Sequence, residues 1–526
     1  MPRHFSLHAS LRASRAARVL HATMPVALSL ALAIGASAAR AQSAPNSLVL
    51  GFRDPPASAR PRTWWHWTRS NVTKDGITKD LEWMRRVGIG GAQLADVNFG
   101  GGQTVEPKVV FGTPEWLDAV RHAAAESKRL GLELDLFASP GWSLTGGPWV
   151  TPAQAMKKLV WSEAHVDGSR HVTLSLPHPP MVNGPIRDLA RGGPSSTDPP
   201  FYGDDAVIAY PTPADERDLA ELHPVVTTNA GAVDGTAVLD DDLNTALVVR
   251  PPADGGPAWI QLAFPAPVTV RAVSLAARGS ITFGRVIASD DGEHFRALVA
   301  LPGAQQYRPS GVRTYAVAPT TARVIRLELT GAPPSPAQVM AQTVPAPARE
   351  YAITELAPHA AARVHRWEEK AGFNFLFEYE SSATPPVPAT SAIPRGSVVD
   401  LSSRMRADGT LDWDAPPGRW TILRFGRSLT GAKNRPAVPA GSGYEVDKLN
   451  RAHVERYLRD YTGPIARALG PLWGTSVRHV LLDSWEAGIQ NWTDGMIGEF
   501  RARRGYDPTP FLPALAGRVV ESAEVS

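Results

Sequence analysis

The sequence contains no cysteine and has almost no net charge. None of its 526 residues is a cysteine, and the formal net charge is only +3. Without cysteine the chain forms no disulfide bonds. The near balance of acidic and basic residues argues against a dedicated nucleic-acid binder.

Motifs of three common enzyme classes are also missing. His66 and His122 lack the spacing to other His, Asp or Glu residues that zinc sites use. The sequence contains neither a phosphate-binding loop nor a Gly-x-Ser-x-Gly turn. Zinc hydrolase, kinase and serine esterase activities are therefore excluded.

Long apolar runs are absent after the N-terminus, so no membrane span is expected in the mature protein. Arginines between 12 and 18 precede an apolar run at 24–36, and Ala-Arg-Ala follows at 39–41. This order predicts a secretory signal peptide over 1–41, with the mature chain starting near Gln42. Adjacent arginines are missing there, which favours ordinary over twin-arginine secretion. Secretion without cysteine indicates a bacterial periplasm.

Tryptophan and proline, by contrast, are abundant, with 15 and 48 residues. Proline favours loop-rich β architecture, and the flat face of tryptophan suits the stacking of sugar rings. Three of the tryptophans stand in "PRTWWHW" (61–67). As a strand, this segment would turn Trp65 and Trp67 toward covering helices, and Trp64 and His66 toward the opposite side.

The first part of the chain alternates strands with helices. Expected strands lie at 63–67, 89–97 and 132–142, and expected helices at 74–87 and 114–130. Such alternation predicts parallel β/α units and a (β/α)8 barrel of the TIM type, whose strand C-terminal ends carry the site. Length alone predicts more than one core.

The alternation of strands and helices stops in the middle of the chain, where short β-like runs follow one another, and it resumes near the C-terminal end. This order predicts an α/β plus all-β protein. The expected organisation is the first barrel part at 42–165, a proline-rich linker with β segments at 166–224, an inserted antiparallel β-sandwich at 225–332, a linker and small β domain at 333–420, and the barrel continuation at 421–526. Only four or five β/α units are recognisable, whereas a closed barrel has eight. We therefore expect an interrupted and incomplete barrel.

"HVLLDSWEAGIQNW" is the strongest chemical signal. Its apolar run predicts a buried strand, and Asp483 and Glu486 follow at the C-terminal end, where barrel enzymes place catalytic groups. A carboxylate beside tryptophan is poorly solvated, which suits a general acid. The alternative is a carboxylate that caps the next helix or pairs with an arginine.

Three loops offer further candidates. Trp142 and Trp149 stand in "SPGWSLTGGPWV" and could stack on a sugar or merely pack the loop. Asn434, Glu445 and Asp447 lie in a long polar connection and are either ligands or solvated loop residues. "LDDDLNTAL" (239–247) would hold a structural calcium ion or form an Asx-rich turn.

Taken together, these blocks resemble the α-L-rhamnosidases of glycoside hydrolase family 106. The resemblance is carried by "PRTWWHWTRSNVTKDGITKDLEWMRRVGIGGAQLADV", "GWSLTGGPWV", "TGAKNRPAVPAGSGYEVDKL" and "DSWEAGIQNWTDGMIGEFRARRGYDPTPFLPALAGRVVES". It implies an elaborated (β/α)8 barrel, release of rhamnose from plant or microbial glycans with inversion, two catalytic glutamates, and a calcium ion near the sugar. Separately, 225–332 resembles a discoidin-like (F5/8 type C) galactose-binding sandwich, although Leu247 replaces a usual aromatic residue.

By this resemblance Glu486 is the general acid, and the second glutamate is expected on a later barrel strand, beyond Ser526. His66, Trp142, Trp149 and Asp483 match the blocks as sugar or calcium contacts, and the calcium ligands stay unassigned. Two other hypotheses remain: a non-catalytic carbohydrate-binding remnant, and another barrel glycosidase with the same accessory modules.

Overall fold

The computed structural model describes residues 47–100, 105–168, 170–179, 201–278, 283–302, 312–331, 340, 348–374 and 383–526. The predicted signal peptide, 1–41, lies outside these residues. The chain divides into two units, Met1–Pro61 and Arg62–Ser526. In the first unit the described residues form helix α2 (Ser47–Arg53). Within the described ranges, no helix combines the length and hydropathy needed to cross a membrane.

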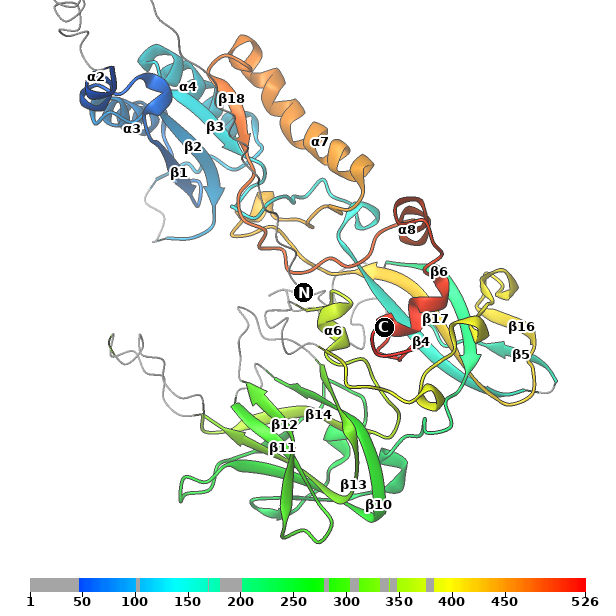
Figure 1. The fold of residues 1–526 in the computed structure, drawn as a ribbon. Coiled ribbons are helices and arrows are strands. Elements are labelled where there is room, and N and C mark those ends of the chain that lie inside the picture. The colour runs from blue at the N-terminus through cyan, green and yellow to red at the C-terminus, as the bar shows by residue number, and fades with distance from the viewer. Residues whose placement is uncertain are drawn as a thin grey trace, which may run out of the picture. The chain divides into compact units, whose positions relative to one another are not determined.

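The second unit begins with a parallel sheet of four strands in the order β1-β2-β3-β18 (Figure 1). The strands are β1 (Arg62–Thr68), β2 (Gly91–Val97), β3 (Glu133–Phe137) and β18 (Val477–Leu481). All neighbouring pairs are parallel. β3 and β18 are neighbours although the remaining β structure lies between them in the sequence. The structure thus contains four adjacent parallel strands of the kind that a barrel requires.

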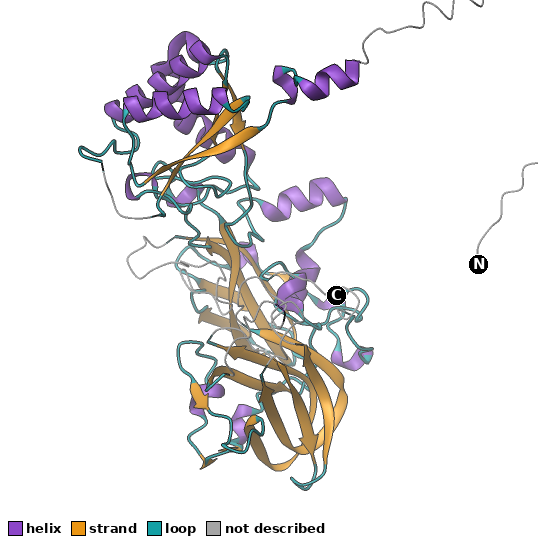
Figure 2. Cartoon of the chain, turned by 90° about the vertical axis from the view of Figure 1, so that its left-hand side faces the viewer, coloured by secondary structure: helices purple, strands orange, loops and turns teal. Residues whose placement is uncertain are grey.

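Helices pack against one face of this sheet (Figure 2). They are α3 (Lys74–Arg86), α4 (Pro114–Leu130) and α7 (Arg451–Leu469). The side chains of Thr73 and Thr113 cap the first two helices, and Gly131 ends α4 in the left-handed conformation. The predicted helices at 74–87 and 114–130 are confirmed.

The two faces of β1 differ as the alternation predicts. Trp65 and Trp67 are buried in a core with apolar residues of α3, α4 and α7. Trp64 is half exposed and His66 partly buried, and both lie on the opposite face. The tryptophans of "PRTWWHW" thus divide between core and accessible surface.

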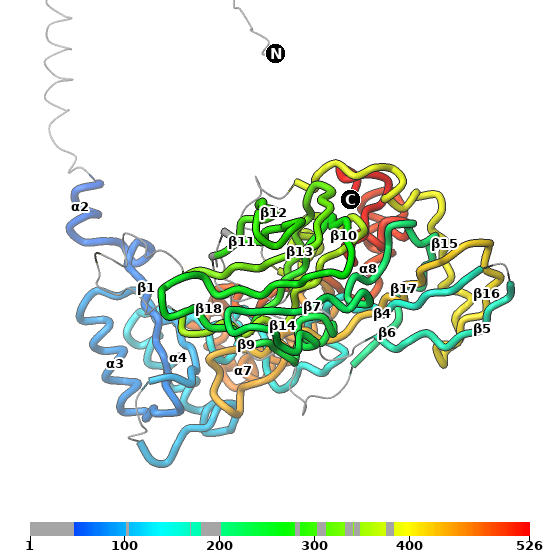
Figure 3. Tube along the Cα trace, turned by 90° about the horizontal axis from the view of Figure 1, so that it is seen from below, coloured from blue at the N-terminus to red at the C-terminus, as the bar shows by residue number. Residues whose placement is uncertain are grey.

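A second, antiparallel sheet has the order β15-β6-β17-β4, and its long strands run side by side in Figures 1 and 3. Its strands are β4 (Lys157–Asp167), β6 (Tyr202–Pro211), β15 (Val399–Asp400) and β17 (Arg419–Leu429), with the pair β5 (His171–Ser175) and β16 (Thr410–Asp414) beside it. β4 and β17 pair with each other, so the predicted boundaries at 165 and 421 cut through one sheet. A buried apolar strand has the same sequence pattern in parallel and antiparallel sheets. The sequence therefore did not show that β4 and β17 belong to one antiparallel sheet.

Short helices pack on this antiparallel sheet. They are α6 (Trp367–Lys370), α8 (Met496–Arg504) and α9 (Leu512–Leu515). Their apolar side chains share a core with strand residues such as Ile208 and Phe425. Helix α8, within the range 421–526 predicted as barrel continuation, therefore packs against the second sheet.

The third sheet has eight strands. Its strands are β7 (Val225–Thr228), β8 (Gly231–Ala232), β9 (Leu247–Val249), β10 (Ala258–Ala277), β11 (Phe283–Ser289), β12 (Phe295–Pro302), β13 (Arg313–Thr330) and β14 (Tyr351–His359). All pairs are antiparallel, around one large apolar core. β14 lies beyond the predicted boundary at 332 but pairs with β10. The proline-rich stretch before β14 interrupts the sequence pattern without ending the sheet.

Candidate active site

An aromatic cluster lies where the parallel strands end. It contains Trp64 and His66 from β1, Phe99 from the loop after β2 and Trp142 from the loop after β3. The Trp142 ring lies 6.5 Å from Trp64, 5.8 Å from His66 and 5.4 Å from Phe99, measured between ring centroids. Trp64 is 50% exposed and Phe99 39% exposed, so the cluster presents an accessible aromatic wall.

Glu486 lies against this wall. The indole Nε1 of Trp142 donates a hydrogen bond to Glu486 Oε2 at 3.2 Å, and the hydroxyl of Ser484 donates to Oε1 at 3.2 Å. The structure thus brings together three of the residues predicted for the site: His66, Trp142 and Glu486. A carboxylate beside an accessible aromatic wall can exchange a proton with a bound sugar.

Two loops hold Trp142 in place by interlocking. Gly141 has a left-handed φ of 82°, and its N–H donates to the carbonyl of Asp96 at 2.6 Å. The N–H groups of Trp142 and Ser143 both donate to the carbonyl of Arg435, and the Arg435 N–H donates to Ser143 Oγ. A Cβ at Gly141 would lie 2.7 Å from this carbonyl, so only glycine fits.

The imidazole of His66 is kept neutral by its surroundings. Burial lowers its pKa from the ordinary value. Its Nε2 atom is buried and has no hydrogen-bond partner within the described ranges. A neutral imidazole with an unused nitrogen can donate to or accept from a sugar hydroxyl.

Asp483 lies on an irregular segment instead of a strand. β18 ends at Leu481, and Leu482, predicted to be buried, is 61% exposed. β18 is the last strand in the observed sheet order, so one side of its end is not covered by another described strand. Asp483 Oδ2 is a buried oxygen without a hydrogen-bond partner among the residues that the structure describes. The alternation of side chains between the two faces of a strand ends with β18 at Leu481. It therefore does not determine the directions of the Asp483 and Glu486 side chains.

Trp149 belongs to a different environment from Trp142. Its ring stacks on Tyr461 at 5.3 Å with an interplanar angle of 12°, and lies 5.8 Å from Tyr457. Both tyrosines are buried in α7. Trp149 thus packs its loop against α7, which is the alternative to a sugar contact, and the sugar contact at Trp149 stays a prediction.

The polar connection after β17 is buried instead of solvated. Asn434 donates to the carbonyls of Pro140 and Gly441 and accepts from the N–H of Gly443. Glu445 and Asp447 are fully buried. Asn434 and Glu445 thus bind the loop that carries Trp142, through Pro140 and Thr145.

Two groups of side chains have spacings compatible with a metal ion, but each already contains a protein cation. The first comprises Glu133, Asp135 and His479, and Arg62 pairs with both of its carboxylates. The second comprises Asp447, His453 and Asp494, and Lys157 Nζ lies within 3.4 Å of both of its carboxylates. These cations neutralise the carboxylates, so neither group fits a divalent ion as it stands.

A different acidic cluster lies on the third sheet. Glu355 of β14 is 95% buried, and its Oε2 has no hydrogen-bond partner in the described part of the chain. Burial and the nearby charges of Asp241, Asp240 and Asp218 raise the pKa of Glu355 to about 8. Three of these carboxylates line a cavity of about 560 Å³ (Asp218, Asp241 and Glu355). Asp240 and Asp242 also form the predicted Asx turns, accepting from the N–H groups of Asp242 and Asn244.

Sequence reasoning missed Phe99, Ser484 and Lys448 as parts of the site. Phe99 and Ser484 contact Trp142 and Glu486 as described above. Lys448 Nζ lies 5.2 Å above the ring of Trp485. Trp64 had a usable signal, because it shares a strand face with His66. No periodic signal marks the other three, which lie on loops.

Comparisons with known proteins give two rhamnosidase matches and one match that carries a different name. Residues 53–526 match the glycoside hydrolase 106 family model, described as alpha-L-rhamnosidase. The structure of a rhamnosidase from Novosphingobium sp. PP1Y superposes with a TM-score of 0.77 at 39% identity, covering 90% of this chain and 43% of that chain. A Formosa agariphila protein named "Putative beta-glucuronidase" is 28% identical over 479 residues, covering 91% of this chain and 27% of that protein. The chain thus spans less than half the length of these two proteins.

Proposed function

Because this chain belongs to glycoside hydrolase family 106, the alpha-L-rhamnosidase family, we propose that it acts in releasing terminal α-L-rhamnose from plant or microbial glycans. The observation that carries the proposal is the placement of Glu486. It lies after a parallel strand, hydrogen-bonded to a tryptophan of an accessible aromatic wall. Sugar-binding sites commonly combine these two elements, an aromatic face and a carboxylate.

In this proposal Glu486 is the general acid. Its proton would pass to the glycosidic oxygen as the bond to the anomeric carbon breaks. Trp142 Nε1 and Ser484 Oγ each donate to one carboxylate oxygen, which fixes the orientation of the group. His66 would line the same sugar site with its ring, which lies 5.8 Å from that of Trp142.

Inversion at the anomeric carbon would require a second carboxylate to activate water on the opposite face of the sugar, ~6.5 to 9.5 Å from the acid. We assign no described residue to this role and expect the base on a further strand of a complete (β/α)8 barrel. The sheet supports a barrel in one respect, since the face of β1 away from the helices carries the half-exposed Trp64.

The test uses an aryl α-L-rhamnoside and the variants Glu486→Gln and Glu499→Gln. Glu499 is a matched control, because it is an exposed glutamate of α8 paired with Arg503. We expect Glu486→Gln to abolish turnover and to retain rhamnose binding measured by calorimetry, while Glu499→Gln behaves as the wild type. Proton NMR of the first sugar released would reveal inversion. Turnover that survives Glu486→Gln would remove the acid role, and wild-type binding without turnover would favour the non-catalytic carbohydrate-binding hypothesis.

We further propose that the acidic cluster on the third sheet holds a calcium ion. Hard carboxylate oxygens are the ligands that calcium prefers, and Glu355 offers a buried oxygen without a partner among the described residues. Asp218, Asp240 and Asp241 would complete the site, and the bound ion would keep Glu355 ionised against the effect of their charges. Calcium should raise the unfolding temperature of the wild type and leave that of Glu355→Gln unchanged. Glu350→Gln, which removes an exposed ion pair with Arg250, is the control and should respond like the wild type.

We also propose export to a bacterial periplasm through the segment 1–41. Mass spectrometry of protein recovered from the periplasm should find a mature N-terminus near Gln42. Recovery of a full-length chain from the cytoplasm alone would contradict this proposal.

A further inference from the structure

The acid-bearing segment 482–491 belongs to no helix or strand. Its position therefore depends on contacts at its ends, where Trp492 forms a backbone bridge with Lys157 and side chains bind the neighbouring residues. We propose that Asp447 is a positioning residue for Glu486: its buried carboxylate fixes the end of this segment and thereby the acid. The inference rests on the proposed role of Glu486.

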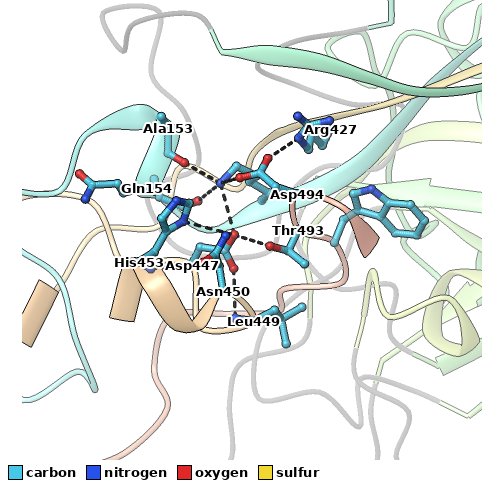
Figure 4. Close-up of polar contacts among 12 residues, drawn as sticks. Ala153, Gln154, Arg427, Asp447, Leu449, Asn450, His453, Thr493 and Asp494 are labelled. Carbon is cyan, nitrogen blue, oxygen red and sulfur yellow. Dashed lines mark hydrogen bonds and ion pairs between the residues drawn. The ribbon is translucent and has the colours of Figure 1, made fainter. Parts of the chain in front are cut away.

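Both oxygens of Asp447 accept hydrogen bonds, and Figure 4 shows those from Leu449 and from Thr493, just after the segment. Oδ2 accepts a hydrogen bond from Thr493 Oγ1 at 2.6 Å, and Oδ1 accepts from the side-chain amide of Gln490. Oδ1 also accepts from the N–H of Leu449 at 3.0 Å. The side chain is fully buried, so water does not compete for these contacts.

A buried lysine compensates the charge of Asp447. Lys157 Nζ lies 3.3 Å from Asp447 Oδ2 and 3.4 Å from Asp494 Oδ2, and donates to the carbonyl of Ala153 at 2.8 Å. Arg427 holds Asp494 from the other side. The ion pairs tie the segment to the start of β4 and to β17, so the second sheet is the base on which the acid-bearing segment rests.

The neighbouring residue, Lys448, holds the segment at two more points. Its N–H donates to Gln490 Oε1 at 3.1 Å. Its ammonium binds Glu445 Oε2 at 2.8 Å and lies 5.2 Å above the ring of Trp485, the residue before Glu486. Lys448 thus contacts Trp485 before Glu486, and Asp447 and Lys448 both bind Gln490 after it.

Loss of the Asp447 contacts should affect the position of Glu486 and not the sugar-binding residues. Loss of the Asp447 contacts would let Glu486 shift relative to the glycosidic oxygen without altering the aromatic wall, which is held by other loops. A misplacement of about 1 Å can reduce a rate on the order of 10²-fold. Binding of the sugar should change little, because His66 and Trp142 stay in place.

The test compares Asp447→Asn and Thr493→Val with the wild type. Thr493→Val is nearly isosteric and removes only the hydroxyl on the segment, so it covers the case in which Asp447→Asn fails to fold. Glu216→Gln is the control, because Glu216 pairs with the buried Arg363 and makes no contact with the segment among the described residues. The readouts are hydrogen–deuterium exchange of 482–494 and kcat and KM for two rhamnosides, one with an activated and one with an unactivated leaving group.

We expect faster exchange in 482–494 for both variants, with unchanged exchange in β1–β3. We expect kcat to fall on the order of 10²-fold for Asp447→Asn with the unactivated leaving group, and much less with the activated one, which needs little protonation. KM should stay near the wild-type value. A uniform loss for both leaving groups, or unchanged exchange in 482–494, would overturn the positioning role. A wild type without turnover would contradict the proposed function, and the exchange result alone would then decide whether Asp447 holds the segment.

Discussion

Asp96 provides a direct test of how the buried face of the parallel sheet is stabilised. This carboxylate at the end of β2 is buried and accepts hydrogen bonds from the indole Nε1 of Trp116 at 3.1 and 3.2 Å. Burial raises its pKa from 3.8 to about 7, and the indole only partly offsets this effect. The folded protein therefore prefers Asp96 protonated.

The sign of the pH dependence follows from this shift. The protonated form contributes stability fully below pH 3.8, and this contribution is lost as the pH rises through about 7. A shift of about three pKa units corresponds to about 4 kcal/mol in all. About 2.5 kcal/mol of that loss falls between pH 5 and pH 8.

Asp96→Asn keeps an acceptor for Trp116 but removes the titration. The free energy of unfolding of the variant, relative to that of the wild type, should therefore rise by about 2.5 kcal/mol as the pH increases from 5 to 8. Urea unfolding followed by tryptophan fluorescence suits the measurement, because Trp65, Trp67 and Trp116 share this core. Asp118→Asn is the control: this exposed carboxylate of α4 has a pKa lowered by Lys74 and Arg121, so its loss should give no gain at pH 8. A pH-independent difference for Asp96→Asn would refute the reasoning.

Three further predictions concern the site. Trp142→Phe keeps the aromatic face but removes the hydrogen bond to Glu486. A hydrogen bond to a charged group contributes about 1.5–3 kcal/mol, so kcat should fall about 10- to 100-fold with little change in KM. An unchanged kcat would contradict a role for this hydrogen bond. Trp149→Ala removes the stacking on Tyr461, so the urea midpoint should drop while rhamnose affinity, measured by calorimetry, stays the same; a loss of affinity alone would restore a sugar contact at this position. Gly141→Ala forces a Cβ to within 2.7 Å of a backbone carbonyl and a strained φ, so it should displace Trp142 and lower both stability and kcat, whereas Gly112→Ala, also at positive φ but with open space around its Cβ, should affect only stability.

The local elements of the parallel sheet could be predicted from the sequence. The helix start after Thr73, the helix start at Pro114 and the stop at Gly131 follow short-range rules, and the structure confirms them. The alternation in β1 also assigned Trp65 and Trp67 to the core, and His66 to the face that carries the aromatic cluster. Such predictions succeed because they depend on neighbours a few residues away.

The partners of strands could not be predicted in the same way. The predicted boundaries at 165 and 421 assigned parts of β4 and β17 to the barrel, yet these strands pair with each other across about 260 positions of sequence. Likewise, Trp142 and Trp149 stand in one glycine-rich loop with similar surroundings. Only the packing of α7 decides that Trp149 stacks on Tyr461 while Trp142 reaches Glu486.

The adjacency of β3 and β18 has a consequence for how the protein is made. The residues that meet at the site, Trp142 and Glu486, are separated by 344 positions. During synthesis the indole therefore exists long before its carboxylate partner, and closing so long a loop is slow unless the intervening sheets have already folded and shortened it. Formation of the site thus depends on correct folding of the sheets between β3 and β18 in the sequence. A defect deep in the eight-stranded sheet would lower activity by reducing the number of molecules that complete the site, without changing the chemistry of those that do.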